Sequence, residues 1–264
     1  MQPTRIQSLF ERLRRQPSTA LIAYITAGDP SPERTPEIVA ALERGGVDLI
    51  ELGVPFSDPI ADGPVIQRAG DRALRAGTTL KRVLEIAAQI RKRSEVPILL
   101  FTYLNPVLRY GLEKLAIDAA AVGIDGCLLT DASVEEAETY IKVMQEHGLD
   151  TVFLAAPTSS PRRLDLLAKY SRGFVYLVSR TGVTGEQASM SNLVAPLVKA
   201  VRERTSLPLA VGFGVSKHEH FEELAKQVEG VVVGSAFMRL IEEFRDDPRL
   251  ETELEQFTRS LKGL

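Results

Sequence analysis

The stretch from Glu51 to Gly63, ELGVPFSDPIADG, carries acids of the kind that do proton chemistry. It begins at the end of an apolar run, so Glu51 is expected at the end of a buried strand and Asp62 on the loop that follows. Pro55 and Pro59 stiffen that loop. Carboxyl groups placed in this way suit general acid/base catalysis. A surface turn whose acids are merely solvated is the plain alternative.

Short apolar runs of strand length recur along the chain and would position these acids. They show no sustained polar alternation, so we expect both faces of the sheet to be covered, as in a parallel sheet. The runs are Leu21–Thr26, Asp48–Leu52, Pro97–Phe101, Gly126–Thr130, Thr151–Ala155, Phe174–Val178, Leu207–Val211 and Val231–Val233.

Amphipathic helical segments lie between the predicted strands. Thr79 to Arg93 places apolar side chains at helical spacing, and Ile6, Leu9, Phe10 and Leu13 form one apolar face near the N-terminus. Serine–proline pairs and capping boxes indicate further helix starts. These are Ser31-Pro32, Ser160-Pro161, Ser133 with Glu136, and Ser216 with Glu219.

Strands that alternate with helices eight times over 264 residues predict an α/β fold, the (β/α)8 TIM barrel. We expect a single domain over residues 1–264, with an N-terminal helix and extra helices after strands two and eight. An open doubly wound sheet is the structural alternative. The eight-fold count and the lack of a break in composition favour the barrel.

The composition excludes several classes of partner. Acids and bases are mixed along the chain, the formal net charge is −3, and no basic stripe indicates a nucleic-acid partner. No apolar run approaches the roughly 18 residues of a membrane span, and the start lacks the apolar core of a signal peptide. Cys127 is the single cysteine and cannot form an internal disulfide. We therefore expect a cytoplasmic protein.

Glycine-containing segments follow each of the last three predicted strands. In a TIM barrel, chemistry gathers at the carboxyl ends of the strands, and GVTG (Gly182–Gly185), GFG (Gly212–Gly214) and GSA (Gly234–Ala236) all fall there. Such glycines let backbone N–H groups approach an anion, and the segment after Gly234 opens a helix with a favourable partial charge. Each pair alone indicates no more than a turn. Together they predict a small-molecule substrate that carries a phosphate.

Other reactive residue types narrow the chemistry. No lysine ends a predicted strand, so a Schiff base lacks its nucleophile. His147, His218 and His220 fall in helices or at a helix start and are expected in solvent, which argues against a zinc or iron site. Magnesium bound through Glu51 and Asp62 stays open, and no cofactor fingerprint is present. Acid/base catalysis by carboxylates remains, with tyrosine as a candidate aid.

The two carboxyl groups are expected to differ in pKa. Burial in the mouth of an apolar barrel raises the pKa of Glu51 toward neutrality, whereas Asp62 on a polar loop is expected to stay ionised. Two carboxyl groups separated in this way can serve as proton donor/acceptor and as charge stabiliser. The alternative for Glu51 is a glutamate paired inside the barrel for stability.

At these residues the chain resembles the tryptophan synthase alpha subunit family. The similarity covers essentially the whole chain and is most specific in ELGVPFSDPIADGPVIQRA (Glu51–Ala69). Further family motifs appear in family order. They are ITAGDP (Ile25–Pro30), LNP (Leu104–Pro106), APTS (Ala156–Ser159), VSRTGVTG (Val178–Gly185), GFGVS (Gly212–Ser216) and GSA (Gly234–Ala236).

The resemblance implies a lyase that cleaves indole-3-glycerol phosphate to indole and D-glyceraldehyde 3-phosphate in L-tryptophan biosynthesis, without a cofactor of its own. It implies that Glu51 is the general acid/base, that Asp62 accepts the indole N–H, and that Tyr176 supports them. Matching phosphate-binding positions are Gly185, Gly214, Gly234 and Ser235. Matching positions around the indole are Tyr24, Ile66, Phe101, Leu128 and Phe213, and simple barrel packing is the alternative for all of these except Phe213.

The resemblance also implies a partner, the pyridoxal-phosphate-dependent beta subunit, which receives indole through a tunnel in an alpha2beta2 heterotetramer. The loops after strands two and six match mobile elements of the family, and Thr184 matches a residue that contacts the aspartate of the strand-two loop on closure. Asn105 and Asp131 match positions near the partner interface. Ala132-Ser133 depart from the family there, where a proline is common.

Two rival functions compete with this interpretation. A phosphoribosyl-type isomerase barrel also binds phosphate after strands seven and eight, but it leaves ELGVPFSDPIADG unexplained. A phosphate-binding barrel that has lost catalysis could act as the allosteric activator of a partner. The presence of Glu51, Asp62 and Tyr176 speaks against that second rival.

Overall fold

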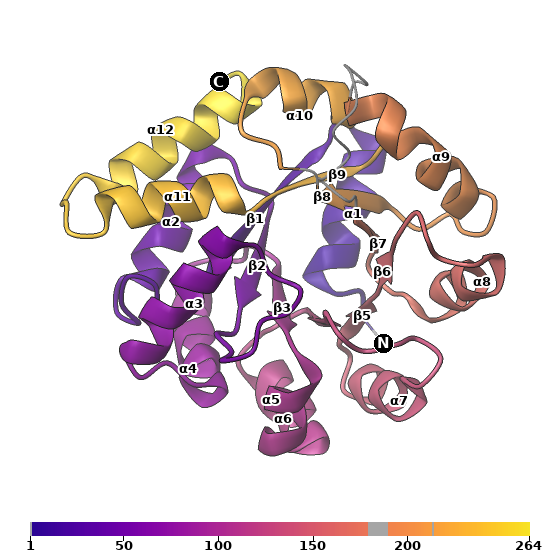
Figure 1. The fold of residues 1–264 in the computed structure, drawn as a ribbon, viewed down its shortest axis with the longest axis horizontal. Coiled ribbons are helices and arrows are strands. Elements are labelled where there is room, and N and C mark those ends of the chain that lie inside the picture. Colours follow the sequence, from indigo (N-terminus) through magenta and orange to yellow (C-terminus); the bar gives the residue numbers. More distant parts are fainter. Residues whose placement is uncertain (1, 179–189, 213) are drawn as a thin grey trace.

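Parallel strands surrounded by helices make up the computed structural model, which describes residues 2–178, 190–212 and 214–264 (Figure 1). Thr184, Gly185 and Phe213, which the sequence places at the site, lie outside the described residues, as does the loop after strand six. The strands are β1 (Ala20–Thr26), β2 (Leu49–Gly53), β3 (Ile98–Thr102), β4 (Gly126–Leu129), β5 (Asp150–Val152), β6 (Leu154–Ala155), β7 (Val175–Val178), β8 (Leu209–Gly212) and β9 (Gly230–Val233).

Helices separate almost all of these strands along the chain. They are α1 (Arg5–Arg15), α2 (Thr35–Gly45), α3 (Pro64–Arg75), α4 (Leu80–Arg91), α5 (Leu104–Tyr110), α6 (Leu112–Ala121), α7 (Glu138–Glu146), α8 (Pro161–Tyr170), α9 (Met190–Arg202), α10 (His218–Ala225), α11 (Ser235–Phe244) and α12 (Leu250–Lys262). No helix in the described part of the chain is long and apolar enough to cross a membrane.

The sheet curves into a barrel, because its two end strands, β5 and β6, are consecutive in the chain. The strands pair in parallel in the order β5-β4-β3-β2-β1-β9-β8-β7-β6, and only Phe153 separates β5 from β6. The predicted (β/α)8 barrel is therefore confirmed. The single predicted strand Thr151–Ala155 is wrong in one respect, because it breaks at Phe153. Before Phe153 the chain pairs with β4, and after it the chain pairs with β7. At the break, the N–H of Tyr176 donates to the Phe153 carbonyl oxygen at 3.1 Å.

The N-terminal helix closes one end of the barrel. Its predicted apolar face is buried against a cluster inside the barrel that includes Ile22, Leu49 and Leu99, all from the first halves of their strands. The rings of Phe10 on α1 and Phe174 lie 5.7 Å apart. Because α1 covers the amino ends of the strands, the carboxyl ends are left for the site.

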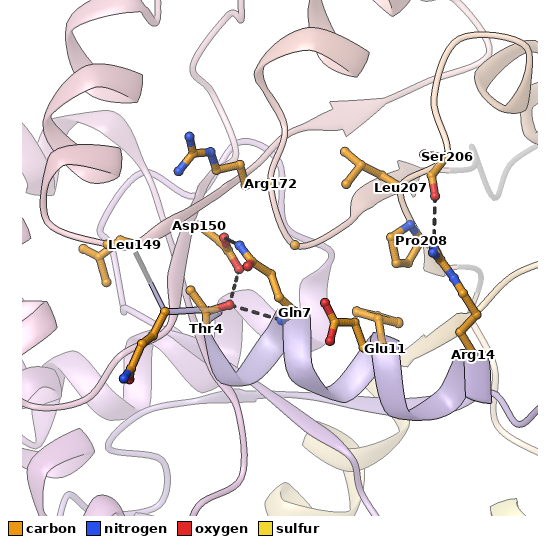
Figure 2. Close-up of a pocket in the computed structure, with 14 residues that line it drawn as sticks. Thr4, Gln7, Glu11, Arg14, Leu149, Asp150, Arg172, Ser206, Leu207 and Pro208 are labelled. Atoms are coloured by element: carbon orange, nitrogen blue, oxygen red, sulfur yellow. Dashed lines mark hydrogen bonds between the residues drawn. The ribbon is translucent and has the colours of Figure 1, made fainter. Parts of the chain in front are cut away.

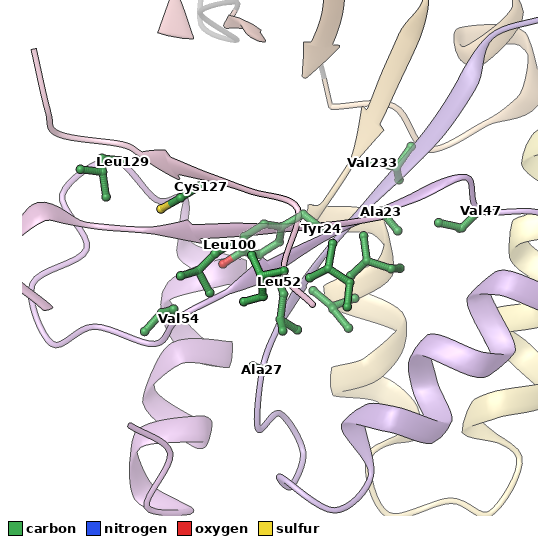
Figure 3. Packing of buried hydrophobic residues seen from close by; sticks show 14 of the residues in the cluster. Ala23, Tyr24, Ala27, Val47, Leu52, Val54, Leu100, Cys127, Leu129 and Val233 are labelled. Carbon is green, nitrogen blue, oxygen red and sulfur yellow. The ribbon is translucent and has the colours of Figure 1, made fainter. Parts of the chain in front are cut away.

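The outward side chains of the strands pack against the surrounding helices. Leu52, Leu100 and Val233 are fully buried in this outer cluster (Figure 3). Both faces of the strands are thus covered, as the continuous apolar runs predict. Burial on both faces also fixes the register, which aligns Tyr24 with Glu51 between β1 and β2.

The helix predictions are confirmed in part. The helix expected within Thr79–Arg93 is α4, and the Thr79 hydroxyl accepts a hydrogen bond from the Arg82 N–H at 3.3 Å. Two helices follow β2 and two follow β9, as predicted. The short helix α5, which follows β3 and precedes α6, was not predicted.

Only one of the predicted helix starts is correct. Ser160 caps α8 by accepting from the Arg163 N–H at 3.2 Å. The other three are wrong, since the helices begin at Thr35, Glu138 and His218. Two serines have local partners instead. The Ser31 hydroxyl accepts from the Arg34 N–H in a turn before α2, and the Ser133 hydroxyl donates to the Glu135 carboxylate.

Candidate active site

Glu51 is buried at the carboxyl end of β2. Side chains alternate along a strand, and Leu49 belongs to the cluster inside the barrel, so Glu51 also points inward. Its side chain is fully buried, and neither carboxyl oxygen has a hydrogen-bond partner among the described residues. Burial raises the pKa of Glu51 to about 8. The direction of this shift agrees with the expected rise toward neutrality, and no described residue pairs with Glu51 as the stability-related alternative requires.

Two buried phenols share the mouth of the barrel with Glu51. Tyr24 is its neighbour on β1, and Tyr176 lies on β7. Burial raises the pKa of both phenols above the ordinary value, and negative charge on Glu51 adds to the rise in each case. Both phenols therefore stay protonated at neutral pH and can donate a hydrogen bond.

Strand glycines make the space for these phenols, which the sequence analysis did not recognise. A Cβ atom at Gly53 would lie 2.4 Å from the Tyr24 hydroxyl oxygen, and one at Gly212 would lie 2.5 Å from that of Tyr176. Real Cβ atoms do not approach other atoms so closely. Gly53 and Gly212 are therefore required by close packing at the site. The only sequence signal was their position at strand ends.

Asp62 lies on the loop between β2 and α3 and is half-buried rather than solvated. Burial raises the pKa of Asp62 to about 6, and hydrogen bonding with the Tyr103 side chain acts in the opposite direction. Asp62 is still mostly ionised at pH 7, as predicted. The structure thus gives a carboxyl group that is mainly protonated and one that is mainly ionised, both on the segment from Glu51 to Gly63.

Apolar side chains expected around an indole are partly brought together. Phe101 and Leu128 are paired in register between β3 and β4. The ring of Tyr24 meets that of Phe101 edge to face at 5.2 Å between centroids. Ile66 is half-buried in the first turn of α3. An aromatic and aliphatic wall of this kind suits a flat apolar ring.

The residues expected to bind phosphate follow two neighbouring strands, β8 and β9. Gly212 and Val232 are paired in register, so the segments after them emerge side by side. Gly214 has a φ of +68°, a backbone conformation that favours glycine. Gly234 is the N-cap of α11, and Ser235 is its first residue. The free N–H groups at the start of α11 make this edge of the barrel suitable for an anion.

Metal-binding groups do not gather in the described residues, which contain no cluster of three or more His, Cys, Asp or Glu side chains able to hold a metal. The three histidines are half-buried rather than solvated. The Nδ1 atoms of His147 and His218 face backbone carbonyl oxygens at 2.9 Å, those of Val143 and Leu261.

Comparison with known proteins decides the family. The family model described as tryptophan synthase alpha chain matches residues 10–263. The chain belongs to this family. A tryptophan synthase alpha chain of Solibacter usitatus (strain Ellin6076) is 71% identical over 259 residues, which cover 98% of this chain and 97% of that protein. The alpha chain of Geotalea uraniireducens (strain Rf4) is 47% identical over 260 residues, with the same coverage.

Solved structures of tryptophan synthase alpha subunits share the fold. The alpha subunit from Legionella pneumophila str. Paris has 36% sequence identity and a TM-score of 0.92, covering 99% of this chain and 98% of that one. A chain from the tryptophan synthase a2b2 complex of Pyrococcus furiosus has 38% identity and a TM-score of 0.84, covering 94% and 99%. The barrel is therefore that of the tryptophan synthase alpha chain family.

A cavity of about 490 Å³ lies at the opposite, amino end of this alpha-chain barrel (Figure 2). The Asp150 carboxylate accepts hydrogen bonds there from the Thr4 hydroxyl and the Gln7 side-chain amide, both at 2.5 Å. The Arg14 guanidinium donates to the Ser206 carbonyl oxygen at 3.3 Å. These polar groups are engaged in holding α1 on the barrel.

The burial of Glu51 predicts a pH-dependent stability. Its folded pKa is raised from 4.5 to about 8, so the stabilisation present below pH 4.5 is lost as the pH rises through 8. Between these values the free energy of unfolding of the wild type should fall, relative to Glu51→Gln, by about 1.4 kcal/mol per pH unit. Urea unfolding of both proteins from pH 5 to pH 8 measures this difference. A difference that does not change with pH would contradict the prediction.

Proposed function

We propose that this chain cleaves indole-3-glycerol phosphate to indole and D-glyceraldehyde 3-phosphate, a step of L-tryptophan biosynthesis. One observation carries the proposal. Glu51 is a fully buried carboxyl group without a hydrogen-bond partner among the described residues, with a pKa of about 8, at the carboxyl end of a barrel strand. Such a group is poised to exchange a proton with a substrate near neutral pH.

In the proposed mechanism Glu51 first gives its proton to the indole ring carbon that bears the glycerol chain. The ring then carries positive charge, which the Asp62 carboxylate stabilises by accepting the indole N–H. Glu51, now ionised, removes the proton of the adjacent glycerol hydroxyl. The carbon–carbon bond breaks and the aldehyde forms. The electron pair of the broken bond returns to the ring and gives indole. One proton is added and one is removed, so Glu51 ends protonated, as it began.

This cycle needs Glu51 protonated and Asp62 ionised at its start. Asp62 is ionised above a pKa of about 6, and Glu51 is protonated below a pKa of about 8. The pH dependence of kcat/KM should therefore be bell-shaped, with an acidic limb near pH 6 and an alkaline limb near pH 8. A steady-state profile of indole release measures it. A rate that rises without a limb between pH 7 and pH 9 would contradict the assignment of Glu51.

Binding in this proposal comes from both sides of the barrel mouth. Gly214, Gly234 and Ser235, together with Gly185, bind the phosphate, and the start of α11 favours its negative charge. The indole ring lies among Tyr24, Ile66, Phe101, Leu128 and Phe213, and Tyr176 supports the reacting centre. Thr184 meets Asp62 when the loops close over the substrate and exclude water.

The chain acts together with a tryptophan synthase beta subunit in an alpha2beta2 complex. A family member of Pyrococcus furiosus forms such a complex, with mutual activation of its parts. We propose that indole passes to that subunit, that pyridoxal phosphate belongs to the beta subunit alone, and that the pair works in the cytoplasm. The Leu104 N–H donates to the Asp131 carboxylate at 2.7 Å, which joins the segments after β3 and β4 near the proposed interface.

An assay of indole release from indole-3-glycerol phosphate tests the function, with the purified chain alone and with a beta subunit. We expect release in both cases, and faster release in the complex. No release under either condition would favour the rival in which the barrel binds phosphate and only activates its partner. Formation of an isomerised sugar phosphate without indole would favour the isomerase rival.

A further inference from the structure

Tyr103 stands directly after β3, and its side chain is buried with an exposed fraction of 2%. It is absent from every role assigned above. Its phenol reaches back to the segment after β2, the loop from Val54 to Gly63 that carries Asp62. Forty-two positions separate Tyr103 from Ala61, whose N–H donates to the Tyr103 hydroxyl oxygen at 3.1 Å.

Tyr103 contacts this loop near both of its ends. At the start, the ring of Phe56 lies 5.1 Å from that of Tyr103, at an angle of 36°. At the end, the Tyr103 hydroxyl accepts from the Ala61 N–H, next to Asp62, and the Asp62 carboxylate is close enough to raise the pKa of the phenol. One side chain thus joins the start of the loop to its catalytic end.

One other described side chain reaches Asp62: the Gln67 side-chain amide on α3 donates to the Asp62 carbonyl oxygen at 2.9 Å, which holds the backbone and not the carboxylate. Ser57, Asp58, Ile60 and Ala61 are exposed, and the side chain of Ile60 is 86% exposed, so apolar burial does not hold the tip. Short turns order the backbone locally, as in the bond from the Asp62 N–H to the Pro59 carbonyl oxygen at 3.0 Å. These turns lie within the loop itself. The Tyr103 phenol instead comes from the residue that directly follows β3.

We propose that Tyr103 is a positioning residue that holds the loop after β2 so that the Asp62 carboxylate faces the indole nitrogen. This role rests on the proposed function. The hydroxyl accepts from the Ala61 N–H, so its own proton is left to donate, and Asp62 is the next residue along the loop. It thereby restricts the orientation of the carboxylate before substrate binds, which spares the reaction that ordering cost.

The charges near Asp62 agree with this role. Among the described residues, Tyr24 and Tyr103 are the ionisable groups whose pKa the Asp62 charge raises, after burial as the main cause. Tyr103 in turn lowers the pKa of Asp62 against the effect of burial. Loss of the Tyr103 hydroxyl should therefore move the ionisation of Asp62 to higher pH as well as free its orientation.

The test is Tyr103→Phe in the complex with the beta subunit, since phenylalanine keeps the ring beside Phe56 and removes only the hydroxyl. We expect kcat to fall about ten- to hundredfold. KM and inhibition by glycerol 3-phosphate should stay within about twofold, because the phosphate site is untouched. The acidic limb of the pH profile should move to higher pH. Adding Tyr103→Phe to Asp62→Asn should cause no further loss.

Tyr140→Phe is the matched control, because its buried hydroxyl donates to the Cys127 carbonyl oxygen at 2.7 Å, away from the loop. It should keep the wild-type kcat and the wild-type acidic limb, whatever its effect on thermal stability. Equal behaviour of Tyr103→Phe and Tyr140→Phe, or a further loss in the Asp62→Asn background, would overturn the positioning role alone. A wild-type complex that releases no indole would overturn the proposed function, and this role with it.

Discussion

Replacement of Glu51 by Gln is expected to lower kcat for indole release by roughly two to four orders of magnitude, the usual contribution of a positioned general acid/base. Gln has almost the same shape, but it cannot give a proton to the ring carbon or remove one from the glycerol hydroxyl. The phosphate site around Gly234 and Ser235 is untouched, so binding of glycerol 3-phosphate should persist. Steady-state kinetics and an inhibition series measure both quantities.

Asp150→Asn is the control for the burial of a carboxyl group. Asp150 is also buried, and burial raises its pKa to about 6, but it lies at the amino end of the barrel beside the start of α1 (Figure 2). Its replacement should alter stability and leave kcat unchanged. Near-normal turnover of Glu51→Gln would refute the proposed mechanism, since no other group in it can carry the proton.

Replacement of Asp62 by Asn should lower kcat by roughly a hundred- to a thousandfold, the effect expected when one stabiliser of developing charge is lost. The amide keeps the shape but not the negative charge that balances the protonated ring. The acidic limb near pH 6 should also disappear, because that limb is assigned to the ionisation of Asp62. A pH series of kcat and kcat/KM for the variant measures both effects.

Asp58→Asn provides the comparison on the same loop. Asp58 is exposed, and its carboxylate accepts from the Ser57 hydroxyl at 2.5 Å. Its replacement removes the same charge a few residues away and should leave kcat and the acidic limb unchanged. If Asp62→Asn instead raised KM and kept kcat, then Asp62 would only help to position the substrate.

The barrel could be predicted because burial on both faces leaves a strong trace in the sequence. A continuous apolar run marked each strand of the barrel. The ends of these runs agree with the observed strand ends to within two residues. The chemistry of Glu51 followed from its place at a strand end, since desolvation acts on any carboxyl group there. The predicted fifth strand is interrupted at Phe153. This break depends on how neighbouring strands share their hydrogen bonds, which cannot be predicted from the spacing of apolar residues.

Local signals failed for some helix starts, for a short helix and for contacts between segments far apart in the chain. Ser133 has the spacing of a helix cap, but its hydroxyl pairs with Glu135, and α7 starts later. The helix α5 has seven residues, too few to show a clear period. The hydroxyl of Tyr103 meets Ala61 only because the barrel places β3 beside β2. Such contacts require the fold and cannot be predicted from the sequence nearby.

The pairing of β1 with β9 sets the moment at which catalysis can begin during protein synthesis. Ala20 on the first strand aligns with Gly230 on the last, and between them lies most of the chain. Glu51 leaves the ribosome early, whereas Gly234 and Ser235 emerge near the end. A nascent chain that stops before β9 therefore has its proton donor but lacks half of the anion site and the strand that closes the ring. Termination before β9 should therefore yield a chain without activity.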